Sequence, residues 1–160
     1  MTPEEAADRI ALRALVEEYA WMADSFDYQG YAALFTPDAT FTGRAPGFDE
    51  PFVRLQGRQA LEQALHANDR FAQTFHAVHN HRCAIDGDRA SGVTYCVARH
   101  YRENGAADDA PEVIITPLRY HDTYRRTPDG WRFASREISF TGVEKALADR
   151  TELATWTGRA

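Results

Sequence analysis

Residues 76–101 read HAVHNHRCAIDGDRASGVTYCVARHY, which is the pattern of two strands joined by a tight turn. Two apolar segments, His76 to Ile85 and Arg89 to Tyr101, flank Asp86-Gly87-Asp88, where the glycine permits the positive φ that a tight hairpin needs. The same alternation continues further along the chain, with a strand at Val113 to Arg126, a turn at Pro128-Asp129-Gly130 and a strand at Trp131 to Phe140. The second half of the chain therefore predicts a run of antiparallel strands.

The first half of the chain has helical patterns instead. Thr2 is a suitable N-cap, Pro3 suits the first helical position, and Glu5 completes a T-x-x-E capping box. Apolar residues then recur at three- and four-residue spacing in one stripe that ends near Asp27. The sequence then predicts a short helix at Tyr28 to Phe35, a strand at Ala39 to Thr42 and a loop or lid at Gly43 to Gln56. A further helix is expected from about Arg58 to Gln73, with an apolar stripe formed by Leu61, Leu65, Asn68 and Phe71. The tail after Val143 could be helical, and its Trp156 is expected to dock on the domain.

Helices followed by antiparallel strands indicate an α+β fold. We expect the helices to pack on one face of a single sheet that is strongly curved and mostly antiparallel. A twisted sheet that wraps a long helix leaves a cavity between the two, and this central pocket is the expected binding site. The length of 160 residues fits one domain over 1–160, with a core at about 8–141 and a C-terminal tail at 142–160.

Charge and composition narrow the classes of partner. The formal net charge of -6 argues against nucleic acid, because a phosphate-binding surface needs clustered Lys and Arg. The sequence has no basic run, no apolar run long enough to span a bilayer and no signal-peptide core, so we expect a cytoplasmic protein that does not bind membranes. Cys83 and Cys96 fall in apolar strand-like segments, which favours two buried reduced thiols over the alternative of a disulfide.

Five sequence motifs occur along the chain in an order that is typical of one protein family. They are YAWMADSFD (19–27), ALFTPDATF (33–41), TFHAVHN (74–80), IDGDRA (85–90) and DGWRF (129–133). In this order they resemble the SnoaL-like family of the nuclear-transport-factor-2-like superfamily over roughly residues 8–141. Within that family the nearest similarity is to enzymes of the scytalone dehydratase and hexachlorocyclohexane dehydrochlorinase type. The resemblance implies a cone-shaped α+β barrel and a homo-oligomer, either a dimer or a trimer.

The resemblance also implies a set of site residues. In the dehydratases, the last Asp of a W-A-D-S-Y-D motif pairs with the catalytic His of a T-x-H motif, and these positions fall on Asp27 and His76. A second dehydratase His aligns with His100. Bile-acid dehydratases of this fold have a Tyr and an Asp five residues apart, which match Tyr19 and Asp24. The expected substrate-binding residues are Asn80, from the T-x-H-x-x-x-N setting of the dehydrochlorinase, and the aromatic residues Trp21, Phe26, Phe41 and Tyr120.

Two positions depart from the dehydratase pattern. Phe26 and Gly43 stand where two tyrosines would hold a catalytic water, and neither side chain can donate a hydrogen bond. Gly43 also replaces the base expected of a ketosteroid isomerase. Elimination across scytalone itself and steroid isomerisation by the usual base are therefore not expected.

An Asp–His pair supports proton transfer. A carboxylate bonded to one imidazole nitrogen fixes the tautomer and raises the basicity of the other nitrogen, so Asp27 and His76 together could act as a general base. By residue type alone, the alternative is that His76 caps a strand start and Asp27 caps the second helix. We expect a cofactor-independent lyase of the dehydratase type, or an isomerase, for a small apolar oxygenated molecule that is polycyclic or polyketide-like. A cyclase or hydratase, and a non-catalytic ligand-binding or assembly subunit, are the alternatives.

Six histidines raise the question of a metal site. His76, His79 and His81 are close in sequence, but strand alternation would place His76 on the opposite face from the other two. The sequence contains no H-E-x-x-H spacing and no Gly-rich phosphate loop. We therefore expect neither a metal ion nor a cofactor.

Overall fold

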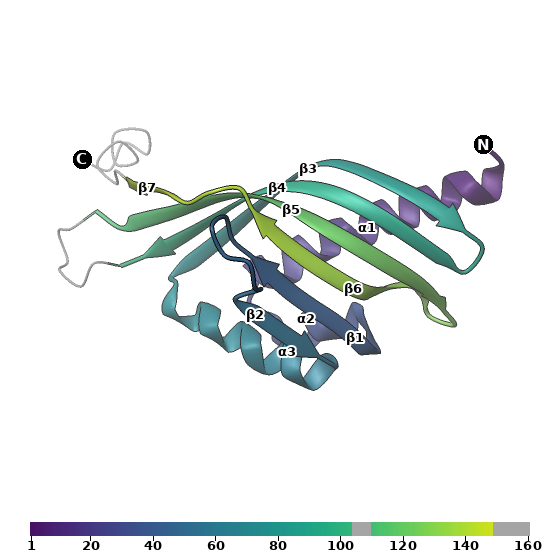
Figure 1. Cartoon of the computed structure of the whole chain (residues 1–160), viewed down its shortest axis with the longest axis horizontal. Coiled ribbons are helices and arrows are strands. Elements are labelled where there is room, and N and C mark those ends of the chain that lie inside the picture. Colours follow the sequence, from purple (N-terminus) through teal and green to yellow (C-terminus); the bar gives the residue numbers. More distant parts are fainter. Residues whose placement is uncertain (104–109, 149–160) are drawn as a thin grey trace, which may run out of the picture.

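A computed structural model describes residues 1–103 and 110–148 of the chain (Figure 1). Its helices are α1 (Pro3–Asp24), α2 (Tyr28–Ala33) and α3 (Arg58–Leu65), the last continued by the 3₁₀ helix η1 (His66–Arg70). Its strands are β1 (Phe35–Arg44), β2 (Val53–Gln56), β3 (Gln73–Asp86), β4 (Arg89–Arg102), β5 (Glu112–Thr127), β6 (Gly130–Phe140) and β7 (Glu144–Leu147).

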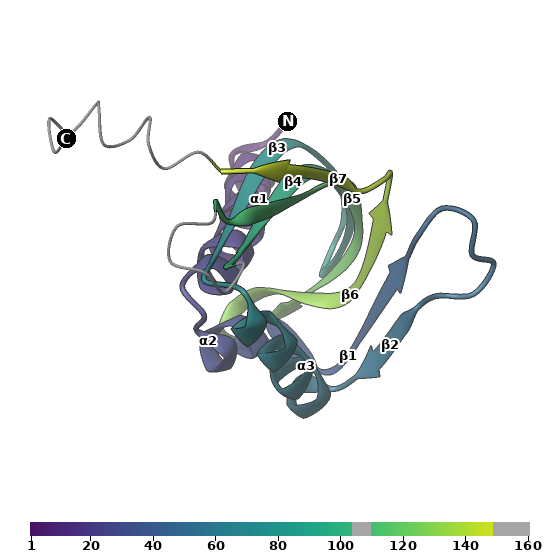
Figure 2. The same cartoon turned by 90° about the vertical axis from the view of Figure 1, so that its left-hand side faces the viewer.

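The strands form one curved sheet in the order β2-β1-β6-β5-β4-β3, with β7 paired to β5. Among the strand pairs of the described residues, β1 and β6 run parallel and the others are antiparallel. Figure 1 shows α1 passing obliquely behind strands β3 to β6, and Figure 2 shows how strongly the sheet curves. The expected α+β fold, with helices on a curved and mostly antiparallel sheet, is confirmed.

The long first helix begins and ends at residues with clear physical roles. The Thr2 hydroxyl accepts a hydrogen bond from the Glu5 backbone N–H at 3.2 Å, as an N-cap does. The Glu5 carboxylate, however, binds Arg9 at 2.8 Å and does not reach back to Thr2, so only half of the expected capping box forms. The helix ends at Asp24, three residues before Asp27, because Ser25 caps it and Phe26 adopts a positive φ of 57°.

Several other boundaries differ from those predicted. The segment expected as a loop contains β2, which pairs with β1 as a hairpin, and β1 itself extends back to Phe35 through a register shift before Thr40. The second helix stops at Ala33, and α3 stops at Leu65, where a 3₁₀ turn takes over. The described part of the tail forms the strand β7 rather than a helix, because it pairs with β5. Trp156 lies outside the described residues.

A bulge in β3 changes which histidines share a face. The pair Val78↔Cys96 is followed by His81↔Thr94, so β3 has one residue more than β4 in this interval. The extra residue shifts the alternation of inward and outward side chains by one position. His81 therefore faces the same side of the sheet as His76, whereas the sequence predicted opposite faces. His81 lies 3.4 Å from the Tyr124 hydroxyl rather than in a ligand cluster. Within residues 1–103 and 110–148, no group of three His, Cys, Asp or Glu side chains is placed to hold a metal ion.

The hydrophobic core lies between α1 and the concave face of the sheet. Leu12, Val16 and Tyr19 of α1 are almost fully buried, and they pack with Phe35 of β1 and Phe133 of β6. Aromatic rings dominate this core, and neighbouring ring centroids lie 4.6–6.2 Å apart, which fixes the angle of α1 on the sheet. Of the helices in the described part of the chain, none is both long and apolar enough to cross a membrane.

Candidate active site

Beyond the aromatic core, the helices and the sheet enclose a cavity of about 260 Å³. This volume lies just below the usual range of small-molecule sites, roughly 300–1,000 Å³. The wall is mostly apolar and comes from α1, α2, α3, the β1–β2 hairpin and strands β3 to β6. The polar side chains that line it are Tyr19, Tyr31, Asn68, His76, His100, Thr116 and Tyr120.

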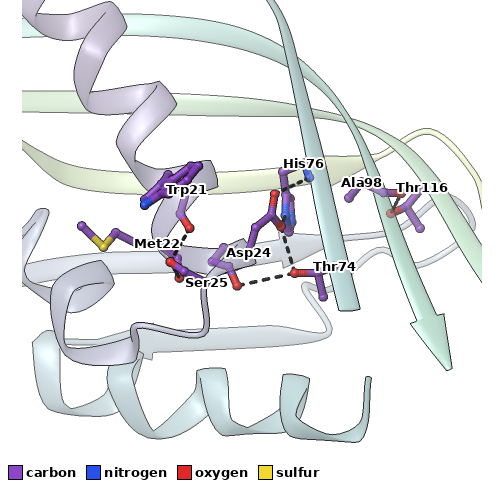
Figure 3. A network of polar contacts seen from close by, with 9 residues as sticks. Trp21, Met22, Asp24, Ser25, Thr74, His76, Ala98 and Thr116 are labelled. Carbon is purple, nitrogen blue, oxygen red and sulfur yellow. Dashed lines mark hydrogen bonds and ion pairs between the residues drawn. The ribbon is translucent and has the colours of Figure 1, made fainter. Parts of the chain in front are cut away.

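The dominant polar feature of this site is a pair formed by Asp24 and His76 (Figure 3). The Nδ1 atom of His76 lies 2.6 Å from Oδ1 of Asp24, and the backbone N–H of His76 donates to Oδ2 at 2.8 Å. The Thr74 hydroxyl donates to Oδ1 at 2.8 Å. Three donors from one stretch of β3 thus hold a single carboxylate at the end of α1.

The surroundings of Asp24 keep it ionised. Partial burial raises the pKa of this carboxyl, but the hydrogen bonds from the His76 ring, the His76 backbone and Thr74 outweigh burial and hold it below the ordinary value of 3.8. A carboxylate only accepts hydrogen bonds, so His76 must carry its proton on Nδ1. The Nε2 atom then has a free lone pair, and no residue in the described ranges is bonded to it. Because the ring lines the cavity, this nitrogen is available to a ligand.

The predicted partner of His76 is therefore wrong, because the carboxylate that binds the ring is Asp24 and not Asp27. Asp27 lies beyond the end of α1 and caps α2, where its carboxylate accepts the Gly30 backbone N–H at 2.8 Å. This is the alternative role that the residue type suggested. Asp24, predicted beside Tyr19 as a site residue, takes the place that the motif comparison gave to Asp27.

His100 lies beside the pair, as expected from the resemblance. Its ring centroid is 5.5 Å from that of His76 and 4.7 Å from that of Phe71. Burial, and then repulsion from His76, lower the pKa of His100 to about 4. The imidazole is therefore neutral at physiological pH, and it suits a hydrogen bond to a ligand oxygen better than the protonation of a leaving group.

Tyr19 and Tyr120 line the cavity, and their rings pack against a buried ion pair formed by Arg136 and Asp122. The Arg136 guanidinium lies 3.8 Å and 4.0 Å from their ring centroids, and it forms two hydrogen bonds, of 2.7 and 2.8 Å, with Asp122. Both charged side chains are fully buried. Asp122 and Arg136 do not line the cavity, while both tyrosines do, so the aromatic rings of Tyr19 and Tyr120 separate the guanidinium from the cavity. Burial raises the pKa of Tyr19 and of Tyr120, which keeps both phenols protonated.

The other predicted site residues divide into two groups. Phe41 and Tyr120 line the cavity as expected. Trp21, Phe26 and Asn80 do not. Trp21 is 69% exposed on the outer face of α1, Phe26 forms the turn after α1 and packs on Tyr28, and Asn80 is exposed at the β3 bulge.

Two features of the site escaped the sequence-based prediction. Asn68 lines the cavity from η1, and its place in the apolar stripe of the predicted third helix was the available signal. Asp122 and Arg136 occupy inward positions of β5 and β6 and pair directly in register. A charged residue among the inward positions Leu118, Tyr120 and Tyr124 of one strand indicated a buried partner.

Comparisons with known proteins agree with this architecture. Residues 4–137 match the family of SnoaL-like domains. An uncharacterized protein of Mycobacterium tuberculosis is 32% identical over 133 residues, which cover 82% of this chain and 84% of that protein. A scytalone dehydratase-like protein from Novosphingobium aromaticivorans has a TM-score of 0.75 at 22% identity, over 93% of this chain and 94% of that chain. The hexachlorocyclohexane dehydrochlorinase LinA-type3 from Novosphingobium barchaimii has a TM-score of 0.73 at 16% identity, over 89% of this chain and 92% of that chain. At these identities the two solved structures show a shared fold.

Proposed function

Because the chain belongs to the family of SnoaL-like domains, whose fold it shares with a dehydratase-like protein and a dehydrochlorinase, we propose that it is a cofactor-independent lyase or isomerase. Its substrate is a small, largely apolar molecule with at least one oxygen, bound in the cavity described above. The observation that supports this most directly is the Asp24–His76 pair, whose imidazole lines that cavity.

The proposed reaction begins with proton transfer to His76. Nε2 takes a proton from a carbon next to a carbonyl, while Asp24 stabilises the imidazolium through Nδ1–H. In an elimination, the C–H electron pair becomes a double bond, and the proton on Nε2 leaves with the departing hydroxyl as water. In an isomerisation, the same proton returns to a different carbon. Both routes conserve charge and atoms, and they need no added reagent.

The remaining polar groups serve to hold the substrate oxygen. His100 is neutral and Asn68 is an amide, so both can donate a hydrogen bond without carrying a charge. The positive end of the Arg136–Asp122 pair lies behind Tyr19 and Tyr120, where it favours negative charge that develops on oxygen during proton removal. The rest of the wall is apolar, which suits a hydrocarbon skeleton.

A hydrogen–deuterium exchange assay tests this proposal without knowledge of the natural substrate. 2-Tetralone, a two-ring ketone with exchangeable protons beside its carbonyl, is incubated with the protein in deuterated buffer and followed by NMR. We expect the wild-type chain to accelerate the exchange, and we expect Asp24→Asn and His76→Gln to reduce the acceleration by roughly 10²–10⁴-fold.

Asp27→Asn is the matched control, because it changes a carboxylate on the same segment that caps α2 and does not contact His76. It should leave the exchange rate unchanged. If the Asp27 variant lost the acceleration while the Asp24 variant kept it, the assignment of the base would be wrong. Binding of the ketone with no exchange in any variant would favour the non-catalytic ligand-binding subunit.

We also propose that the protein is a homo-oligomer, a dimer or a trimer. Large aromatic side chains are exposed on strands β3 and β4, at Phe75 and Tyr95, and Arg119 stacks on the Tyr95 ring at 4.8 Å. Exposed aromatic and arginine side chains are typical of protein interfaces. Light scattering of the purified chain measures the molecular mass, and a monomeric mass would refute this part of the proposal.

A further inference from the structure

The β1–β2 hairpin closes one end of the cavity with an unusual contact. A Cβ atom added to Gly43 would lie only 2.6 Å from Cζ of Phe52 and 2.7 Å from Cγ1 of Val53. The backbone of Gly43 is not in the left-handed region, so no turn requires glycine there. What requires it is space, because the Phe52 ring lies directly against the Gly43 backbone. The Phe52 N–H donates to the Gly43 carbonyl at 2.9 Å, which fixes this approach.

Phe52 stands between the cavity and the solvent. Its ring lines the cavity, yet 58% of the residue is exposed. The ring packs against Phe140 at the end of β6, with a centroid distance of 5.5 Å. A side chain that contacts both the cavity and the surrounding water forms the boundary of the cavity at this end.

We propose that Phe52, seated on Gly43, determines the size of the ligand that the cavity accepts. The ring limits the cavity at its hairpin end, and the absent side chain at position 43 is what allows the ring to lie there. This inference rests on the proposed function only in taking the cavity as the ligand site. It is independent of which residue removes a proton.

Binding of two fluorescent probes of different size tests the inference. 2-Naphthol has two fused rings and 9-phenanthrol has three, and each has one hydroxyl group for the polar residues of the cavity. We expect the wild-type chain to prefer 2-naphthol. Phe52→Ala should shift the ratio of the two dissociation constants towards 9-phenanthrol by about tenfold or more, a change comparable to that caused by small differences of size in apolar pockets.

Phe48→Ala is the matched control. Phe48 is on the same hairpin and is 70% exposed, but it does not line the cavity, so its removal should leave the ratio unchanged. An equal shift in the Phe48 and Phe52 variants, or no shift in the Phe52 variant, would overturn the inference. Circular dichroism of every variant checks that the fold is retained.

Gly43→Ala provides a second test that leaves the Phe52 ring intact. The added methyl group clashes with the Phe52 ring at two atoms and with Val53 at one, so the ring must shift and this variant should also change the size preference. In the Phe52→Ala background the same substitution should have a much smaller effect, because only the Val53 contact is left. Fully additive effects would contradict a mechanism through Phe52.

The same assay separates this inference from the proposed function. If the exchange assay showed no acceleration while Phe52→Ala still shifted the binding ratio, the catalytic proposal would fail and the role of Phe52 would stand. Failure of both probes to bind either the wild type or the Phe52 variant would overturn the proposed ligand cavity, and the inference with it. Binding with an unchanged ratio would overturn the role of Phe52 alone.

Discussion

Substitution of Asp122 by asparagine should destabilise the protein more than the loss of any surface ion pair. Asp122 forms two hydrogen bonds with Arg136, at 2.7 and 2.8 Å, and accepts a third from the Tyr124 hydroxyl at 3.0 Å. Asparagine keeps the size of the side chain, but it removes the charge and turns an N–H₂ group towards the guanidinium. The arginine would then be a buried cation with no counter-charge, and one of its nitrogens, Nη1, already lacks a hydrogen-bond partner among the residues that the structure describes.

The expected loss is about 3–5 kcal/mol in the free energy of unfolding, which is the usual cost of breaking one side of a fully buried ion pair. For a chain of this length, such a loss corresponds to a decrease in Tm of roughly 6–20 °C. Urea unfolding followed by circular dichroism measures the free energy, and a thermal scan measures Tm. An m-value equal to that of the wild type would show that the change lies in stability and not in the surface exposed on unfolding.

Asp38→Asn is the control for this experiment. Asp38 binds Arg125 with the same two-pronged geometry, at 3.2 and 3.0 Å, but both side chains are exposed. Solvent screens this pair, so the control should lose little stability. Replacement of both buried charges, by Asp122→Leu with Arg136→Met, should recover most of the stability lost in D122N. If D122N were no less stable than D38N, burial would not control the strength of this pair, and the reasoning would be wrong.

Two further predictions concern protonation and thiol reactivity. His100 has a pKa of about 4 in the folded chain against an ordinary value of 6.5, so the unfolded chain binds this proton first and stability should fall as the pH is lowered from 6.5 to about 4. His100→Gln should reduce this decrease in urea titrations at several pH values, and an unaltered pH dependence would contradict the assignment. Cys96 is buried with its pKa raised to about 11, whereas Cys83 is partly exposed, and neither forms a disulfide. A thiol-specific reagent should therefore modify Cys83 in the native protein and Cys96 only after unfolding; fast native-state labelling of both would refute this.

Local signals in the sequence were sufficient for the general architecture. The cap at Thr2 and the tight turn at Asp86-Gly87-Asp88 depend on neighbouring residues only, and both are present as predicted. Alternation between inward and outward positions identified the long strands for the same reason. The order of the motifs then indicated the family, which the match over residues 4–137 shows.

Long-range contacts decided the details that matter for chemistry. The sequence predicted Asp27 as the partner of His76, whereas the structure pairs Asp24 with it, and the difference depends on where α1 ends. That end is set by the turn at Ser25 and Phe26 and by the donors that β3 presents to Asp24, which no local pattern reveals.

The same limit applies to the sheet and to the cavity. The bulge that turns His81 inward and the parallel pairing of β1 with β6 depend on strand register, which is a property of two distant segments together. Gly43 illustrates the distinction well. The sequence by itself determined that position 43 lacks a side chain that could bind water or a proton. Only the tertiary structure decided that the Phe52 ring occupies the space beside it, because that contact forms across a hairpin whose two arms pack over the cavity.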